Sequence, residues 1–250
     1  MKTVKKALAV LDLFDKDAQE QNFTDVVKKL GFHKSTTHVL LKTLTELNLL
    51  IYDPKTKKYS LGYKLLELAG RITYGRDIRN IAMPVMQELS EKLKEDISLN
   101  ILVEGRRVCI AIAESQSFVR HIIPLGKALP LHCSAAGKVL MAHLSLDKIH
   151  DIIKKYGLQK FTSKTITTTE RLLSELKLVR QNGLGESRTE FGEEAAAIAF
   201  PIINGKGEII AALSIQSTVS RLNEKNRNLF VSKGLKASRK ISGYLLEVLS

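Results

Sequence analysis

The sequence predicts an α+β protein with a helical N-terminal part that ends in a β-hairpin and a larger part built on an antiparallel sheet. Three observations predict this class. Apolar residues recur at helical spacing in successive segments of the first 50 residues. Strand-like apolar segments face each other across turn residues at 98–114 and 196–217. These strands come in hairpins rather than after each helix, which favours an antiparallel sheet over a parallel one.

The composition is that of an ordinary globular protein, with 44% hydrophobic and 26% charged residues in a chain of 250. This length suggests one or two domains, each with a core of its own. No apolar run approaches the roughly 18 residues of a membrane helix, so we expect no membrane association. The basic and apolar N-terminus is interrupted by Asp12 and Asp15 and lacks a small-residue cleavage site. We therefore expect a cytoplasmic protein without a signal peptide.

The two cysteines, Cys109 and Cys133, cannot form a disulfide framework, and neither belongs to a Cys-x-x-Cys pair. His132 beside Cys133 is a poor metal site, because adjacent residues on a strand or helix point in different directions. We therefore expect no metal and no cofactor, and we assign both thiols to the core or to a pocket.

Positive charge is denser near the N-terminus. The formal net charge is +13. Residues 1–76 carry 14 Lys/Arg and 8 Asp/Glu, a net charge of +6, and the other 174 residues carry 25 and 18, a net charge of +7. The charge density is thus about twofold higher in the first third, which favours nucleic acid as the partner of this part.

The first two helices follow from apolar periodicity and from end signals. Residues 23–30 end at Gly31, the usual stop signal, and Thr24 is the expected N-cap residue. The helix before them has an apolar stripe at helical spacing. This stripe comprises Val4, Ala7, Leu8, Leu11 and Phe14.

The third helix lies in residues 31–50, GFHKSTTHVLLKTLTELNLL. Its apolar stripe, which we expect to be buried, comprises Leu40, Leu41, Leu44 and Leu47. At about 100° per residue the opposite face comprises Ser35, His38, Val39 and Lys42. Hydroxyls, a ring nitrogen and a cation near a helix N-terminus are groups that read a DNA groove, although a solvated face explains them equally well for a lone helix.

A β-hairpin follows the third helix. An apolar strand at 49–52, a turn at Asp53-Pro54 and the alternating strand KYSLG predict it. Its tip carries the lysines Lys55, Lys57 and Lys58. The order helix, helix, turn, helix, hairpin is that of a winged helix-turn-helix, with residues 31–50 as the recognition helix and the lysines beside DNA phosphates. A generic helical core explains the leucines but not the basic hairpin, so we predict binding to DNA.

A linker helix and a second domain are expected after the hairpin. Gly70, Gly75 and Pro84 break the helical pattern that follows it. We place the domain limits at 1–62 for the DNA-binding domain, 63–76 for the linker helix and 77–250 for the second domain.

Hairpins and amphipathic helices make up the second domain. Its hairpins turn at Glu104-Gly105-Arg106 and at 204–207, and VRHIIPLG, residues 119–126, is a further expected strand. The expected helices span 134–145, 145–157, 168–183 and 224–249.

An enzyme is the main alternative class. The stretch SAAGKV is similar to a phosphate-binding loop, but His132 replaces the required first glycine and Val139 replaces the Ser/Thr that holds Mg²⁺. The stretch NGLGESR lacks the third glycine of a dinucleotide site. Cys133 with His121 or His132 is a conceivable nucleophile and base, but a pocket-lining role is favoured. We therefore predict no catalytic residues. A general DNA-binding protein without an effector is the second alternative.

At this point the chain resembles the IclR-type transcriptional regulators over essentially its whole length. The motifs that carry the resemblance, in the family's order, are VKKALAVLDLF, KSTTHVLLKTL, DPKTKKYSLGYKLLEL, LPLHCSAAGKVLMA, ITTTERLLSELKLVRQNGLG and IAFPIINGKGEIIAALSI. The resemblance implies an N-terminal winged helix that binds double-stranded operator DNA and a C-terminal GAF-like domain that binds a small-molecule effector. It also implies a homodimer or tetramer that reads a pseudo-palindrome. The expected function is ligand-responsive regulation of a metabolic operon, by repression rather than activation.

The resemblance also assigns residues. Positions that face DNA in the family are matched here by Lys34, Ser35, Thr36, His38 and Lys42. Val39 stands where family members usually carry Arg, so an outward valine here either contacts a thymine methyl group or leaves one of the family's contacts absent.

In the effector domain the resemblance implies a pocket-lining segment that contains Cys133, Ser134 and Ala135. The family's binders of small acids usually show an Asp, a Cys and two Ser further along the chain. Here the matching positions are Ser187, Ala197, Ser214 and Gln216, and Glu194 stands where Gly is usual. Because the acid and the thiol are replaced, we expect a ligand other than a short keto-acid, larger or less polar.

Overall fold

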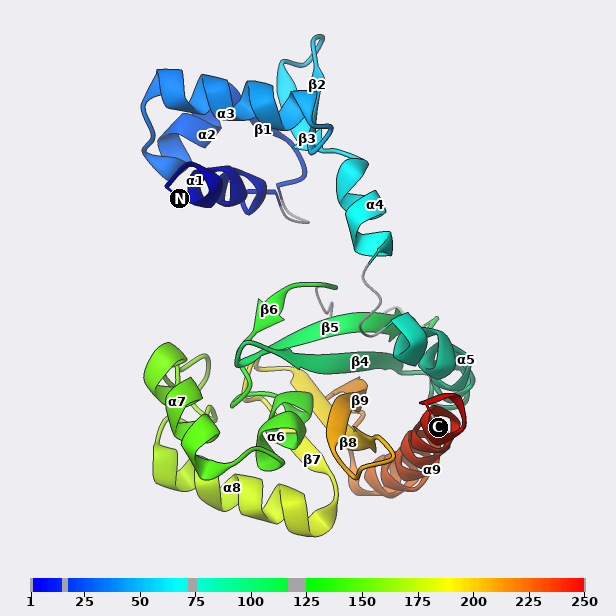
Figure 1. Ribbon diagram of the computed structural model, residues 1–250. Helices are drawn as coiled ribbons and strands as arrows, with labels where there is room; N and C mark the ends of the chain where they lie inside the picture. The colour runs from blue at the N-terminus through cyan, green and yellow to red at the C-terminus, as the bar shows by residue number, and fades with distance from the viewer. Residues whose placement is uncertain (1, 15–17, 72–75, 117–124, 250) are drawn as a thin grey trace. The chain divides into compact units, whose positions relative to one another are not determined.

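The computed structural model describes residues 2–14, 18–71, 76–116 and 125–249. The chain divides into two compact units, Met1–Tyr74 and Gly75–Ser250 (Figure 1). Among the described helices, none combines the length and the apolar character that crossing a membrane requires. The strand expected at 119–126 lies almost entirely outside the described residues; Leu125, at its end, forms an isolated parallel bridge with Cys109.

The N-terminal unit is a winged helix-turn-helix, as predicted. Its elements are α1 (Lys2–Leu11), β1 (Gln21–Asn22), α2 (Phe23–Leu30), α3 (Lys34–Glu46), β2 (Leu50–Asp53), β3 (Lys58–Leu61) and α4 (Lys64–Gly70). The strands form an antiparallel sheet in the order β1-β3-β2, and the hairpin of β2 and β3 is the wing. The core of this unit includes Val10, Val26, Leu41, Leu44 and Leu50.

Two details of the first two helices differ from the prediction. The N-cap residue of α2 is Asn22 rather than Thr24, and its side chain accepts a hydrogen bond from the backbone N–H of Asp25 at 2.8 Å. In α1 the predicted stripe residues Val4 and Leu8 are exposed, because the face that packs on the core is formed by Ala7, Val10 and Leu11 instead. The stop at Gly31 is confirmed, since this residue has φ +66° in the left-handed region.

The wing is attached to the end of α3 through Gly62. The N–H of Gly62 donates to the carbonyl of Leu49 at 2.8 Å. A Cβ atom at this position would lie 2.1 Å from the carbonyl oxygen of Asn48, so only glycine fits without moving the backbone. This close approach holds β3 against the segment that follows α3.

The C-terminal unit is a mixed α+β domain whose described strands form one antiparallel sheet, in the order β6-β5-β4-β9-β8-β7. The strands are β4 (Asp96–Val103), β5 (Arg106–Ala113), β6 (Ala128–Leu129), β7 (Gly185–Arg188), β8 (Ala195–Ile203) and β9 (Ile209–Thr218). The helices are α5 (Arg76–Leu93), α6 (Ala135–Ala142), α7 (Leu146–Tyr156), α8 (Thr169–Asn182) and α9 (Glu224–Leu249). Figure 1 shows α5 and α9 on one face of the sheet and α6, α7 and α8 on the other.

Alternation along the strands gives the two faces different side chains. Ile97 and Leu99 of β4 belong to the apolar cluster under α5 and α9. Ser98 and Asn100 point to the opposite face, because successive side chains of a strand alternate. On that face Ala197 and Ala199 of β8 pack in the cluster that contains α6 and α8. We call this second face the α6 face.

Pro84 does not break the helix, contrary to the prediction. Helix α5 runs through it from Arg76 to Leu93. Proline removes one backbone hydrogen bond, but Ala82 and Met86 on either side are completely buried against the sheet and α9. This packing outweighs the local preference of proline.

Candidate functional site

The exposed face of α3 carries the side chains predicted to contact DNA. Five of them are exposed and Thr36 is half-buried; the exposed ones are Lys34, Ser35, His38, Val39 and Lys42. Val39 is 62% exposed, so the core of this unit does not explain an apolar residue there. Of the predicted buried stripe, Leu40, Leu41 and Leu44 are buried, but Leu47 is 56% exposed and that prediction is wrong. Leu47 is already the residue after the last helical residue, which turns it away from the core.

The N-terminus of α3 is open to a phosphate. Its N-cap residue His33 makes no side-chain cap hydrogen bond within the described residues. The first N–H groups of a helix have no partner inside the helix and bind phosphate oxygens well. Lys42 lies 3.9 Å from Glu46, but both side chains are more than half exposed, and such a pair holds a lysine only weakly.

The wing tip presents two lysines. Lys55 and Lys57 lie in the turn between β2 and β3, and both are exposed. The Asp53 carboxylate accepts hydrogen bonds from the Lys55 N–H at 2.8 Å and from the Thr56 hydroxyl at 3.0 Å. These bonds, the first above all, lower the pKa of Asp53. The turn is therefore built by Asp53, and the lysine side chains are not needed for it.

Lys58 is not at the tip, contrary to the prediction. It is the first residue of β3, and its ammonium group lies 2.9 Å from Glu20, which raises the pKa of Lys58 through the hydrogen bond. The sequence showed three nearby lysines but not that the turn would end before the third. Of the three, Lys58 is the least available to a phosphate.

The α6 face brings together predicted effector residues that are far apart in the sequence. Ser187 of β7 lies opposite Ala197 of β8, which lies opposite Gln216 of β9. Ser214 is two residues before Gln216 and therefore on the same face, where it lies opposite Ser98 of β4. Ser187, Ala197 and Ser214 are all buried.

The start of α6 closes on this face. Cys133 is 1% exposed, and the Ser187 hydroxyl donates to its carbonyl at 3.5 Å. Ser134 is the N-cap residue of α6, since its hydroxyl accepts from the N–H of Gly137 at 3.1 Å, and Ala135 is fully buried. The hydroxyl of Ser134 thus has a structural role in addition to the predicted ligand role.

Sequence reasoning missed three buried polar side chains on the α6 face, those of Ser98, Asn100 and Arg107. Gln216 Nε2 donates to Ser98 Oγ at 3.1 Å and to Ser214 Oγ at 2.8 Å. Asn100 Nδ2 donates to Ser98 Oγ at 2.9 Å, and Arg107 Nη1 donates to Asn100 Oδ1 at 2.7 Å. The signal was present in β4, where two polar residues alternate with apolar ones in a strand that is buried on both faces. The α6 face is therefore polar, which does not suit the less polar ligand expected from the sequence.

Lys138 is the buried lysine of the stretch that is similar to a phosphate loop. Its ammonium group lies 2.8 Å from Glu175 of α8 and 2.8 Å from Glu190, which follows β7. Burial raises the pKa of Glu190. These two ion pairs link α6 to α8 and to the segment after β7. Because two carboxylates already neutralise its ammonium group, Lys138 is not available to bind a phosphate.

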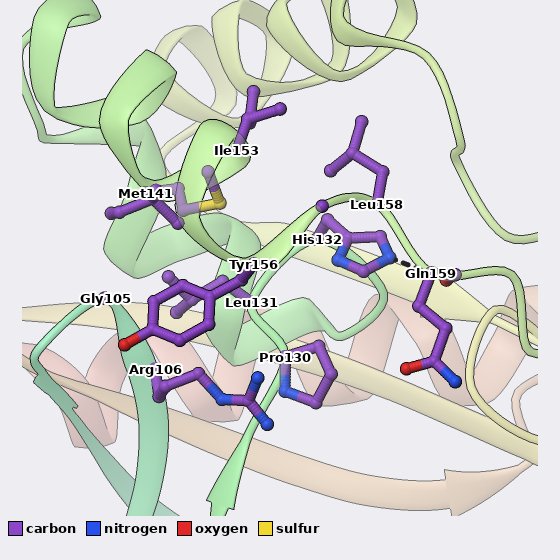
Figure 2. A pocket seen from close by; sticks show the side chains of 12 residues that line it. Gly105, Arg106, Pro130, Leu131, His132, Met141, Ile153, Tyr156, Leu158 and Gln159 are labelled. Atoms are coloured by element: carbon purple, nitrogen blue, oxygen red, sulfur yellow. Dashed lines mark hydrogen bonds between the residues drawn. The ribbon is translucent and has the colours of Figure 1, made fainter.

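Cys133, with His121 or His132, is the conceivable nucleophile and base of the enzyme alternative. Burial raises the pKa of the Cys133 thiol to about 12, so the unreactive thiol form dominates at neutral pH. His132 Nε2 is hydrogen-bonded to the carbonyl of Gln159 at 3.0 Å (Figure 2). Burial lowers the pKa of His132. His121 lies outside the described residues.

The pocket in Figure 2 contains none of the predicted effector residues among its lining. It lies between the β4–β5 turn, α7 and the segment before α6, with Arg106, His132, Met141 and Tyr156 among its lining residues. Its volume of about 30 Å³ has room for little more than one water molecule. A cavity of this size does not hold an organic effector.

Comparisons with known proteins agree on one family. Residues 3–54 match the family model described as the IclR helix-turn-helix domain, and residues 71–243 match the bacterial transcriptional regulator IclR C-terminal domain. The chain is 33% identical over 248 residues to the HTH-type transcriptional regulator XynR of Escherichia coli, covering 98% of each chain. It is 31% identical over 231 residues to the HTH-type transcriptional repressor AllR of Escherichia coli, covering 92% of this chain and 84% of the relative.

A solved structure shows the same fold. The IclR homologue from Microbacterium hydrocarbonoxydans, crystallised as a complex with 4-hydroxybenzoate, superposes with a TM-score of 0.85 at 23% identity. The similarity covers 97% of this chain and 98% of that one. Both units of the chain therefore have counterparts in one known protein.

Proposed function

Because the chain belongs to the IclR family of bacterial transcriptional regulators, we propose that it is a ligand-responsive regulator that binds specific operator DNA. The observation that carries the proposal is the exposed face of α3, whose polar side chains the core does not require. In this proposal α3 enters the major groove, where Ser35 and His38 reach base edges and Val39 contacts a thymine methyl group. Lys55 and Lys57 on the wing bind phosphates.

The C-terminal unit binds the effector in this proposal. The α6 face is the site, with the residues Cys133, Ser134, Ala135, Ser187, Ala197, Ser214 and Gln216. Two or four copies of the chain bind a pseudo-palindrome, and the effector changes the spacing or orientation of their winged helices. A coupling free energy of about 1–3 kcal/mol would change operator affinity roughly 5- to 150-fold, enough to regulate a gene.

The regulated genes are metabolic, and the regulator is a repressor that acts in the cytoplasm, where operator DNA is found. The relative AllR, which is a repressor, supports this sign of regulation. No catalytic activity is part of the proposal, because the family consists of regulators.

Selection of bound fragments from genomic DNA tests the proposal. The selected fragment is then titrated with the full chain at several salt concentrations, beside competitor DNA of the same length. A discrete pseudo-palindromic site that binds more tightly than competitor supports the regulator. Equal binding to all sequences that falls steeply with salt would overturn it in favour of a general DNA-binding protein.

Variants of the two predicted contact groups sharpen the test. Ser35→Ala with His38→Ala should abolish the preference for the selected site and leave binding to competitor DNA unchanged, because only base contacts are lost. Intact preference in the folded double variant would contradict the assignment of α3.

Removing the wing lysines should change the salt dependence of DNA binding and not the preference for the selected site. Lys55→Gln with Lys57→Gln should reduce the slope of log affinity against log salt by about 2, since two phosphate contacts are lost. Lys58→Gln is the matched control and should change the slope much less, because Glu20 already binds its ammonium group. A slope change of about 1 in Lys58→Gln, half that expected for the double variant, would contradict the placement of the wing.

A further inference from the structure

A buried cation on the α6 face lacks a counter-ion among the described residues. Arg107 of β5 is 7% exposed, and its described hydrogen bond joins Nη1 to Asn100 Oδ1 at 2.7 Å. Its Nε has no hydrogen-bond partner among the described residues, and in the same part of the chain the guanidinium forms no ion pair.

Lys138, another buried cation of this unit, is neutralised by carboxylates, unlike Arg107. Lys138 is 1% exposed, like Arg107 almost out of contact with water, but it contacts the carboxylates of both Glu175 and Glu190. A buried charge without a partner costs several kcal/mol, which makes such a group a candidate for a functional site. Arg107 stays charged at neutral pH even though burial lowers its pKa.

The surroundings of Arg107 also favour an anion. The thiols of Cys109 and Cys133 are close enough to affect its pKa, and the Cys133 thiol is neutral at pH 7. Helix α6 begins two residues after Cys133, so its electropositive N-terminus lies near the same place. The N–H groups of Ala135 and Ala136 at that end have no acceptor inside the helix. A guanidinium and a helix N-terminus are two independent groups that bind carboxylates and phosphates.

We propose that Arg107 binds the anionic group of the effector, a carboxylate or a phosphate, on the α6 face. A row of polar side chains, the buried Asn100, Ser98 and Ser214 and the half-buried Gln216, extends away from Arg107 and offers hydrogen-bond partners to the polar remainder of the ligand. This inference rests on the proposed function only in taking the α6 face as the effector site. It adds the ligand's charge and the residue that recognises it.

Thermal unfolding of the full chain, followed by circular dichroism, tests the inference without DNA. The probes are sodium acetate, sodium phosphate and acetamide, the last being a neutral molecule of the same shape as acetate. Sodium chloride at matched ionic strength gives the baseline, because any anion acts on a protein of charge +13. The variants are Arg107→Met and its control Arg106→Met, which removes the same charge from the adjacent residue.

Acetate or phosphate should raise the unfolding temperature of the wild type and of Arg106→Met, saturably and on the order of 5 °C at about 100 times the dissociation constant. Acetamide should not, and Arg107→Met should lose the shift. An effect of acetate alone identifies a carboxylate site and of phosphate alone a phosphate site; both support the inference. No shift beyond the chloride baseline, or an equal shift in all three proteins, would overturn it.

Without any probe, Arg107→Met should unfold at the same temperature as the wild type or higher, because it removes an unpaired buried charge. If this variant does not fold, Arg107→Gln, which keeps a donor for Asn100, replaces it in the same comparison. A large loss of stability in both variants would mean a structural arginine and would also overturn the inference. Operator binding is measured separately, so failure of the anion site and failure of the proposed function give different results.

Discussion

In the N-terminal unit the candidate functional side chains are exposed, whereas in the C-terminal unit they are buried. Val39 on α3 is 62% exposed, and Lys55 and Lys57 project from the wing tip. Ser214 and Ser98 on the α6 face have no exposed surface. The first group is contributed by two adjacent elements, and the second by strands and a helix from β4 to β9.

The difference suits what each site is proposed to bind. A DNA duplex is too large to be enclosed, so its contacts must project from a small rigid surface. A small molecule is enclosed, and its contacts come from residues that the folded sheet brings together. Mutations should therefore separate the two sites, since exposed contacts can be removed at little cost in stability, whereas removing a buried group that is packed or paired is costly.

The largest expected effect is on the C-terminal unit. Lys138→Met leaves Glu190 buried without a cation, and we expect a loss of about 3–5 kcal/mol in the free energy of unfolding of this unit. Urea denaturation followed by circular dichroism measures the loss. Hydrogen exchange of the α3 amides should stay unchanged, because the N-terminal unit has a core of its own.

The control for this variant is Lys177→Met on α8, an exposed lysine whose loss should change stability by less than about 0.5 kcal/mol. Adding Glu190→Gln to Lys138→Met should restore part of the stability, since the unpaired carboxylate is then gone. A Lys138→Met protein as stable as the control would show that the buried ion pairs contribute nothing.

The next effect belongs to the N-terminal unit. Leu41 is completely buried, so Leu41→Ala should lower the free energy of unfolding of this unit by about 2–5 kcal/mol and abolish DNA binding through unfolding. Leu47→Ala removes the same atoms from an exposed position and should change stability by less than about 0.5 kcal/mol. Chemical denaturation of both variants decides; equal losses would mean that Leu47 is buried, as the helical pattern alone predicts.

The smallest expected effect separates capping from ligand binding at Ser134. Ser134→Ala should cost about 0.5–2 kcal/mol in stability through loss of the N-cap of α6. Ser145→Ala removes the equivalent cap of α7, away from the α6 face, and should cost a similar amount. If Ser134→Ala alone weakens the response to an effector in an operator-binding titration, the hydroxyl also serves the ligand; equal responses would assign it to the cap.

Local patterns predicted the N-terminal unit well. The leucines of α3, the stop at Gly31 and the turn at Asp53 are properties of short segments, so the element order and most of the exposed face followed from them. The errors came where a local preference met tertiary packing. Helix α5 continues through Pro84 because its neighbours are buried, and Leu47 is exposed because α3 ends before it.

The C-terminal site could be predicted only in part. Strand β7, GESR, was missed because it has no apolar alternation and is held by pairing with β8. Arg107 and Asn100 were missed because their proximity depends on the register of β4 and β5, including an irregularity after Leu99. Nothing in the sequence near Lys138 shows that Glu175 and Glu190, from separate elements, would lie on it.

The close fit at Gly62 fixes the position of the wing relative to α3, and with it the geometry of the proposed DNA-binding surface. With β3 held against the end of α3, the distance between groove contacts and phosphate contacts is set before any DNA arrives. Little conformational entropy remains to be lost on binding within one half-site. A rigid surface formed by α3 and the wing cannot adapt to an operator in which a base pair has been inserted inside the half-site. In the proposed complex with two half-sites, tolerance of altered spacing must then lie between the half-sites.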